Sequence, residues 1–281
     1  MSHNEFRFRI RIVMAGRDGE LLTLEAKQDI ARLVIRDALR EYSRPAILWD
    51  GSKESTACLH LVKSVAETDG RNVPPVIFVD HGDHFPETLS YMESLKGKWN
   101  LNFVVARNDD AIGKARNDLI YISELDSGNM REVQDIGFAG GFFQLSAGSE
   151  IRDHLLLTVP LLTAIRRYRF DSVFTGLGMQ MRRPRENGNF ISDSGSYVRV
   201  NPILTFLEKD VWAYLFENDI PIHPKYREGY TSVAGLHQSP KVSDTPAWQV
   251  DGATAKGIPE KIDDPERQET MKQKFRSLGY M

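Results

Sequence analysis

The chain has 281 residues, of which 41% are hydrophobic and 27% charged, with a formal net charge of −3. These proportions are ordinary for a soluble globular protein, and the charge excludes a globally basic nucleic-acid or membrane binder. The lone cysteine, Cys58, excludes an intrachain disulfide and any metal site built from cysteines alone. The first residues lack the charged-then-apolar pattern of a leader, and the apolar stretch 154–165 is too short to cross a membrane. We therefore expect a cytoplasmic protein with no membrane span.

The N-terminal part of the chain predicts a strand and a helix. Residues 6–12 alternate apolar and basic side chains, which is typical of a half-buried edge strand whose arginines face water. Residues 24–42 carry apolar side chains at helical spacing, including Ile30, Leu33 and Val34.

A repeating order of strand and helix follows. Buried strands are predicted at 45–49, 76–79, 102–105 and 172–174, and helices at 56–65, 86–95 and 151–168. This order implies right-handed crossovers and a parallel sheet covered on both faces. The sequence thus predicts an α/β fold with a doubly wound parallel sheet.

Two regions are less regular. Residues 107–148 show neither the spacing of a helix nor that of a strand, and two interpretations remain for this segment, a lid and an interface. We expect one nucleotide-binding domain over 1–238 and a C-terminal tail over 239–281, with a last helix at 266–278.

Unusual polar segments follow three of the predicted strands, at 50–55, 80–88 and 175–186. Ligands of open parallel sheets bind beyond the carboxyl ends of the strands. Because all three polar segments follow strands of the predicted sheet, the sequence predicts one shared site at the carboxyl ends of those strands.

The 50–55 loop, Asp-Gly-Ser-Lys-Glu-Ser, has residues suited to phosphate. Gly51 and Ser52 let backbone N–H groups approach an anion, and the positive end of the following helix favours it. Lys53 adds a full charge and Ser55 a hydroxyl donor. A plain turn with an N-capping serine is the alternative.

Asp50 is the residue that fits phosphate least. A carboxylate repels an anion unless a metal ion or a lysine lies between them. The spacing also differs from a Walker A loop.

The 50–55 loop resembles the Ser-Gly-Gly-Lys-Asp-Ser loop of the pyrophosphate-loop ATPases, with matches at Gly51, Lys53 and Ser55. Residues 79–88, Val-Asp-His-Gly-Asp-His-Phe-Pro-Glu-Thr, resemble the Val-Asp-Thr-Gly-x-x-Phe-Pro-Glu-Thr of a family in the same superfamily. That family includes phosphoadenosine phosphosulfate reductase, the small subunit of sulfate adenylyltransferase and eukaryotic-type FAD synthetase.

Two later segments, 202–215 and 220–233, are similar to the acidic-Asp-Val-Trp and Gly-Tyr-x-Ser-Ile segments of the same family. The chain is identified on these motifs as a member of that family, from about residue 20 to about residue 235.

The resemblance implies an adenine nucleotide alpha hydrolase-like fold that binds ATP with Mg²⁺. Adenine would lie near Leu48 and Phe78, and the phosphates on the 50–55 loop. The implied cofactor-binding residues are Leu48, Asp50, Gly51, Ser52, Lys53, Ser55, Phe78, Asp80 and Gly176. No side chain is assigned as a metal ligand.

Arg182, Arg183 and Arg185 form a basic cluster, and guanidinium forks grip sulfate or phosphate in pairs of bonds. With Lys53 they are the candidate catalytic residues, and a solvated basic loop is the alternative. Residues 178–181, Gly-Met-Gln-Met, replace an Arg-Asp-Glu run that is usual in the family.

The resemblance disfavours a reductase, because reductases of the family need a cysteine near the C-terminus and none follows Cys58. The sulfate adenylyltransferase small subunit needs none, and it resembles residues 271–279. We therefore expect sulfate, or a similar oxyanion, to attack the α-phosphorus of ATP.

The resemblance implies a GTPase partner subunit. A homo-oligomer stays open, and a nucleic-acid partner is not expected. An ATP pyrophosphatase that adenylates another acceptor in sulfur insertion and a non-catalytic nucleotide-binding protein remain alternatives.

His81 and His84 alternate with Asp80 and Asp83. Four ligands within one turn rarely converge on one ion, so substrate contact or loop structure is the expectation.

Overall fold

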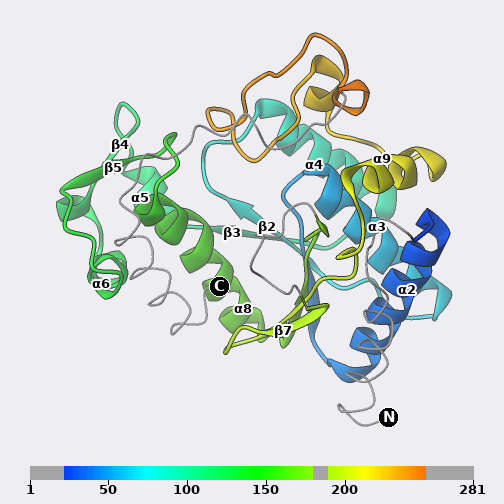
Figure 1. Cartoon of the computed structure of the whole chain (residues 1–281). Helices are drawn as coiled ribbons and strands as arrows, with labels where there is room; N and C mark the ends of the chain where they lie inside the picture. Colours follow the sequence, from blue (N-terminus) through cyan, green and yellow to red (C-terminus); the bar gives the residue numbers. More distant parts are fainter. Residues whose placement is uncertain (1–21, 180–188, 251–281) are drawn as a thin grey trace.

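The structure is a computed structural model that describes residues 22–179 and 189–250. A six-stranded sheet runs through its centre in the order β3-β2-β1-β6-β8-β7 (Figure 1). The strands are β1 (Pro45–Leu48), β2 (Val76–Asp80), β3 (Phe103–Arg107), β6 (Ser172–Phe174), β7 (Ile191–Asp193) and β8 (Val198–Val200). All neighbouring pairs are parallel except β7 with β8. The predicted fold class is confirmed.

Helices cover both faces of this sheet, and the alternation of side chains along the strands decides which face each residue meets. Ile47 and Phe78 pack into the larger core with α2 (Leu24–Glu41) and α3 (Lys53–Thr68). Their strand neighbours, Ala46 and Ile77, pack on the opposite face with α8 (Val159–Tyr168).

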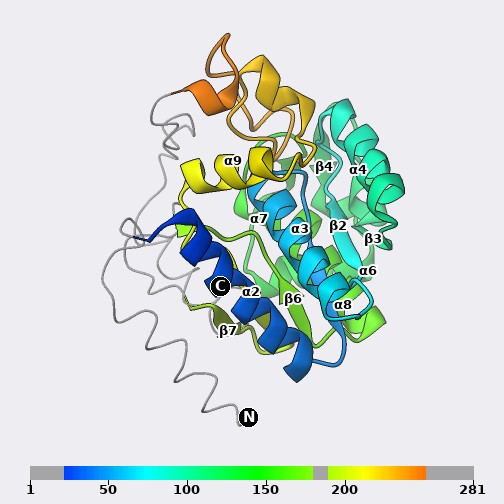
Figure 2. The same cartoon turned by 90° about the vertical axis from the view of Figure 1, so that its right-hand side faces the viewer.

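Two further helices, α4 (Pro86–Trp99) and α9 (Glu208–Glu217), also contribute to the larger core. Figure 2 faces the layer of α2 and α3.

The helix predicted at 151–168 is present with an internal irregularity. It consists of α7 (Glu150–Asp153), a π-helical turn at His154–Thr158 and α8. Pro160 has no N–H to donate, and its ring would crowd the carbonyl one turn earlier. The wide turn accommodates this proline without ending the helix.

Residues 107–148 form a packed unit beside α8, on the left of Figure 1. It contains α5 (Asp109–Gly113), β4 (Leu119–Tyr121), η1 (Ile122–Glu124), α6 (Ser127–Asp135) and β5 (Phe142–Gln144). The strands β4 and β5 pair antiparallel, and Ile120 and Phe143 share a small core with Leu155.

The last described segment, 218–250, folds over α9 with the 3₁₀ turns Pro224–Glu228 and Ala247–Gln249. The rings of Trp248 and Trp212 lie 5.6 Å apart.

The predicted edge strand at 6–12, the predicted helix at 266–278 and the three candidate arginines lie outside the described residues. In the part that is described, no helix combines the length and the apolar character needed to cross a bilayer.

Candidate nucleotide-loop site

The site lies where the chain reverses the order in which it adds strands. From β1 the chain builds outward to β2 and β3, and it then returns to place β6 on the other side of β1. Such a switch point opens a crevice beyond the carboxyl ends of the two central strands. The 50–55 loop follows β1 and Gly176 follows β6, so both lie at the carboxyl ends of these two strands.

The 50–55 loop turns sharply into α3. Gly51 has φ +86°, a left-handed conformation that favours glycine. Ser52 is the N-cap of α3, and its side chain accepts a hydrogen bond of 3.2 Å from Ser55 N–H. The helix therefore begins at Lys53, earlier than predicted, and Lys53 lies in its first turn.

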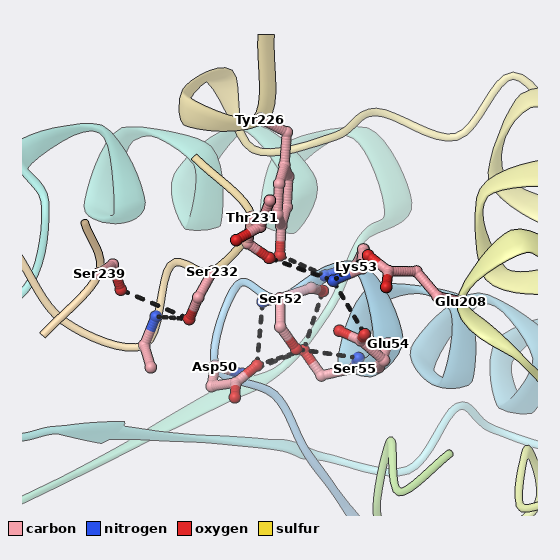
Figure 3. Close-up of polar contacts among 11 residues, drawn as sticks. Asp50, Ser52, Lys53, Glu54, Ser55, Glu208, Tyr226, Thr231, Ser232 and Ser239 are labelled. Carbon is pink, nitrogen blue, oxygen red and sulfur yellow. Dashed lines mark hydrogen bonds and ion pairs between the residues drawn. The ribbon is translucent and has the colours of Figure 1, made fainter. Parts of the chain in front are cut away.

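Asp50 folds back onto the start of this helix. Its Oδ1 atom accepts hydrogen bonds from Ser52 N–H at 2.9 Å and from the Ser55 hydroxyl at 2.6 Å (Figure 3). The carboxylate therefore neighbours the positive end of α3, where a negative charge is stabilised.

Lys53 points toward α9 and the segment that covers it. Its Nζ atom lies 3.0 Å from Glu54 Oε1 and 3.4 Å from Glu208 Oε1, and it donates to the Thr231 carbonyl at 3.3 Å. The side chain is only 7% exposed. Burial raises the pKa of Glu208, and the Lys53 charge opposes that shift.

Aromatic rings complete the surroundings of Lys53. Nζ lies 5.7 Å from the ring centre of Trp212 and 5.4 Å from that of Tyr226. The Tyr226 hydroxyl also accepts a 3.0 Å hydrogen bond from Lys53 N–H. Burial raises the pKa of Tyr226 well above its ordinary value, so the hydroxyl keeps its proton.

Gly176 contacts the backbone of the loop directly. A Cβ atom at this position would lie 2.6 Å from Ser55 N and 2.7 Å from Ser55 Cα, so only glycine permits the approach. The neighbouring Thr175 hydroxyl donates to Asn201 Oδ1 at 2.6 Å, which fixes the end of β6.

The other candidate residues lie on β1 and β2. Leu48 of β1 pairs with Ile77 of β2, and Phe78 is the next residue along β2, fully buried beside Trp49. Burial raises the pKa of Asp80, but hydrogen bonds from His84 and Arg107 outweigh it and hold that pKa far below its ordinary value.

Two residues of the 81–84 segment contact distant parts of the chain. His81 Nδ1 accepts a 2.9 Å hydrogen bond from the buried Arg152 guanidinium, and burial lowers the pKa of His81 to about 3. Asp83 Oδ1 lies 2.6 Å from His237 Nδ1. Within 22–179 and 189–250, no three His, Cys, Asp or Glu side chains are grouped as metal ligands. In the structure, His81 contacts Arg152 and Asp83 contacts His237, so both side chains join the strand-end loop to distant segments.

The structure thus brings Asp50, Gly51, Ser52, Ser55 and Gly176 together. Sequence reasoning did not place Glu208, Tyr226 or Thr231 in the site, although the motifs 202–215 and 220–233 contain them. Only the folded chain shows that both motifs close over the loop.

Comparison with known proteins gives the family. Residues 44–241 match the family described as phosphoadenosine phosphosulfate reductase domain. The chain belongs to the phosphoadenosine phosphosulfate (PAPS) reductase family. This confirms the resemblance seen in the motifs.

Two curated relatives show the range of this PAPS reductase family. The chain is 27% identical over 170 residues to phosphoadenosine 5′-phosphosulfate reductase of Alkalilimnicola ehrlichii, covering 60% of this chain and 62% of that protein. It is 30% identical over 249 residues to sulfate adenylyltransferase subunit 2 of Streptomyces lavendulae, covering 75% of this chain and 68% of that protein. The match therefore spans about three fifths to two thirds of their lengths.

Solved structures of the family fold agree with the sheet described above. PAPS reductase from Candida auris, a phosphate complex, superposes with a TM-score of 0.53 at 16% identity and covers 78% of this chain and 98% of that one. Candida glabrata FMN adenylyltransferase with FMN and the ATP analog AMPCPP gives 0.56 at 14% identity, covering 79% and 70%.

Proposed function

We propose that the chain binds an adenine nucleotide with its phosphates at the 50–55 loop and transfers the adenylyl group of ATP to sulfate or a similar oxyanion. The observation that carries this proposal is the contact between Gly176 and the first turn of α3, at 2.6 Å from Ser55 N for an added Cβ. It joins a glycine turn, a helix N-terminus and two strand ends at the switch point, where parallel sheets bind nucleotides.

The state of Cys58 favours transfer over reduction. This cysteine is fully buried in α3, and burial raises the pKa of its thiol well above the usual range. A sulfur nucleophile must be an accessible thiolate. The similarity to a sulfate adenylyltransferase subunit also supports transfer, as does the fold on which FMN adenylyltransferase holds an ATP analog.

In the proposed reaction a sulfate oxygen forms a bond to the α-phosphorus, and the bond from that phosphorus to the bridging oxygen breaks, so pyrophosphate leaves. Such a displacement depends on positioning and on neutralising negative charge. The N-terminus of α3 and Lys53 would serve the phosphates. Arg182, Arg183 and Arg185 would hold the oxyanion, and they lie outside the described residues.

Mg²⁺ in such a site is held mainly by phosphates and one or two carboxylates, so no preformed cage is needed. Asp50 is the exposed carboxylate of the loop and fits that requirement. When bound, the ion would supply charge neutralisation. A GTPase partner subunit and a homo-oligomer belong to the same proposal, because the chain matches a subunit of sulfate adenylyltransferase.

The test is release of pyrophosphate from Mg-ATP by the purified chain, with and without sulfate. The Lys53→Ala variant removes the loop charge, and Lys96→Ala is the matched control because its side chain is 48% exposed on α4. Sulfate-stimulated release by the parent and by Lys96→Ala, but not by Lys53→Ala, is the expected result.

Two outcomes would redirect the proposal. A correctly folded Lys53→Ala variant with full activity would show that the phosphates bind elsewhere. Silence of all three proteins would call for titration with ATP and adenylyl sulfate, and binding without turnover would favour the non-catalytic alternative.

A further inference from the structure

Hydrogen-bond donors of the 50–55 loop are engaged from within the chain. Ser52 N–H and the Ser55 hydroxyl both donate to Asp50 Oδ1, at 2.9 and 2.6 Å. Ser55 N–H donates to Ser52 Oγ at 3.2 Å, and Lys53 N–H donates to the Tyr226 hydroxyl at 3.0 Å. A phosphate that bound here would have to take over these donors.

The positive charge of Lys53 is likewise compensated by side chains of the chain itself. The Lys53 ammonium lies within 3.4 Å of two carboxylates, those of Glu54 and Glu208. Asp50 adds a third carboxylate, so formal negative charges outnumber the positive one around the loop. A free polyphosphate would therefore meet net repulsion.

We propose that Asp50 determines which anions this loop accepts, because its carboxylate occupies the position that a phosphate oxygen would take. This inference rests on the proposed function only in assigning phosphate to the 50–55 loop. A carboxylate and a phosphate compete for the same features: N–H and O–H donors and the positive end of a helix.

The geometry goes beyond an ordinary turn. The bond from Ser52 N–H to Asp50 Oδ1 alone is the usual closure of an aspartate turn. The second bond, from the Ser55 hydroxyl, draws the carboxylate onto the first turn of α3. An incoming phosphate must break both bonds and then face the displaced charge, unless a divalent cation lies between them.

The experiment is a calorimetric titration of the full chain with inorganic pyrophosphate in the presence of a chelator, which prevents bridging by a divalent cation. The Asp50→Ser variant restores the hydroxyl found in related loops and removes the carboxylate. Asp50→Asn keeps the shape and removes the charge, with an NH₂ group in place of one oxygen. Asp29→Asn removes the same charge from an exposed position on α2, where the side chain is 69% exposed, and is the matched control.

We expect Asp50→Ser to bind pyrophosphate on the order of tenfold tighter than the parent, or more, because the freed donors then serve the ligand. Asp50→Asn should also gain affinity, and Asp29→Asn should match the parent. The inference is overturned if both Asp50 variants, folded as judged by their melting temperatures, bind pyrophosphate no tighter than the parent.

The same proteins separate this inference from the proposed function. If Asp50→Ser gains pyrophosphate affinity while no protein binds Mg-ATP, the inference stands and the adenylyl transfer proposal fails. If the parent binds Mg-ATP but the Asp50 variants gain no pyrophosphate affinity, the proposed function stands and the role of Asp50 fails.

Discussion

Gly176 and Ser55 are in backbone contact: a Cβ atom on Gly176 would lie 2.6 Å from Ser55 N. This contact joins the end of β6 to the first turn of α3, two segments that are far apart in the sequence. The packing of α3 against the end of β6 therefore depends on the absence of a side chain at Gly176.

Gly176→Ala is expected to push α3 away from β6. Overpacking of this kind lowers the free energy of unfolding by about 1–3 kcal/mol, and here the added methyl group displaces the end of the 50–55 loop itself. Urea unfolding should show the lost stability, and a nucleotide titration should show weakened binding. Gly97→Ala in α4 is the control, because nothing lies within 4 Å of its added Cβ and alanine favours a helix. Equal stability of Gly176→Ala and the parent would contradict the contact.

Arg152→Lys should destabilise the fold although it keeps the charge. The buried guanidinium donates to the Leu145 carbonyl at 3.0 Å and to His81 Nδ1 at 2.9 Å, in directions that one ammonium cannot match. A hydrogen bond to a charged group contributes about 1.5–3 kcal/mol, and lysine should not recover both of these bonds. Urea midpoints test this, with the exposed Arg166→Lys as the control. A midpoint for Arg152→Lys equal to that of the control would refute it.

Buried histidines should make the protein less stable in mild acid. Burial lowers the pKa of His223 to about 4 and that of His81 to about 3, from an ordinary value of 6.5. The unfolded chain then takes up protons at a higher pH than the folded chain, so stability is complete above about pH 6.5 and is lost as the pH falls toward 4.

This dependence is measurable as a fall of the urea midpoint between about pH 7 and about pH 5. The fully buried His223 accepts from Lys225 N–H and contacts the Thr88 hydroxyl at 3.0 Å. Replacing it in His223→Gln should flatten the fall, because glutamine does not titrate. An unchanged slope would show that His223 does not contribute.

Cys58 should be unreactive in the folded protein. It is completely buried, and burial raises the pKa of its thiol, so a thiol reagent should modify it only after unfolding. Cys58→Ala should keep pyrophosphate release from Mg-ATP. Loss of turnover in a folded Cys58→Ala protein would instead favour thiol chemistry.

The strands and helices that lead to the site were predictable because they alternate buried apolar runs with polar loops. The run predicted at 76–79 is β2, Val76–Asp80, and the loop after β1 was placed correctly. The hairpin of β7 and β8 was missed, because strands of three residues are too short to display an alternating pattern.

The orientation of Lys53 could not be predicted from local sequence. Its amine contacts Thr231, 178 residues further along the chain, and Glu208 on α9. Local pattern gives the residue type suited to phosphate, but only long-range packing decides where the ammonium points. The phosphate role of Lys53 therefore stays a prediction.

The hydrogen bond from Lys53 N–H to Tyr226 has a consequence for how the protein is made. The loop emerges early from the ribosome, but its cover at 226–231 emerges much later, so the site cannot be complete in the nascent N-terminal half. Contacts of such long sequence separation form slowly. We expect the 50–55 loop to acquire its final form among the last events of folding.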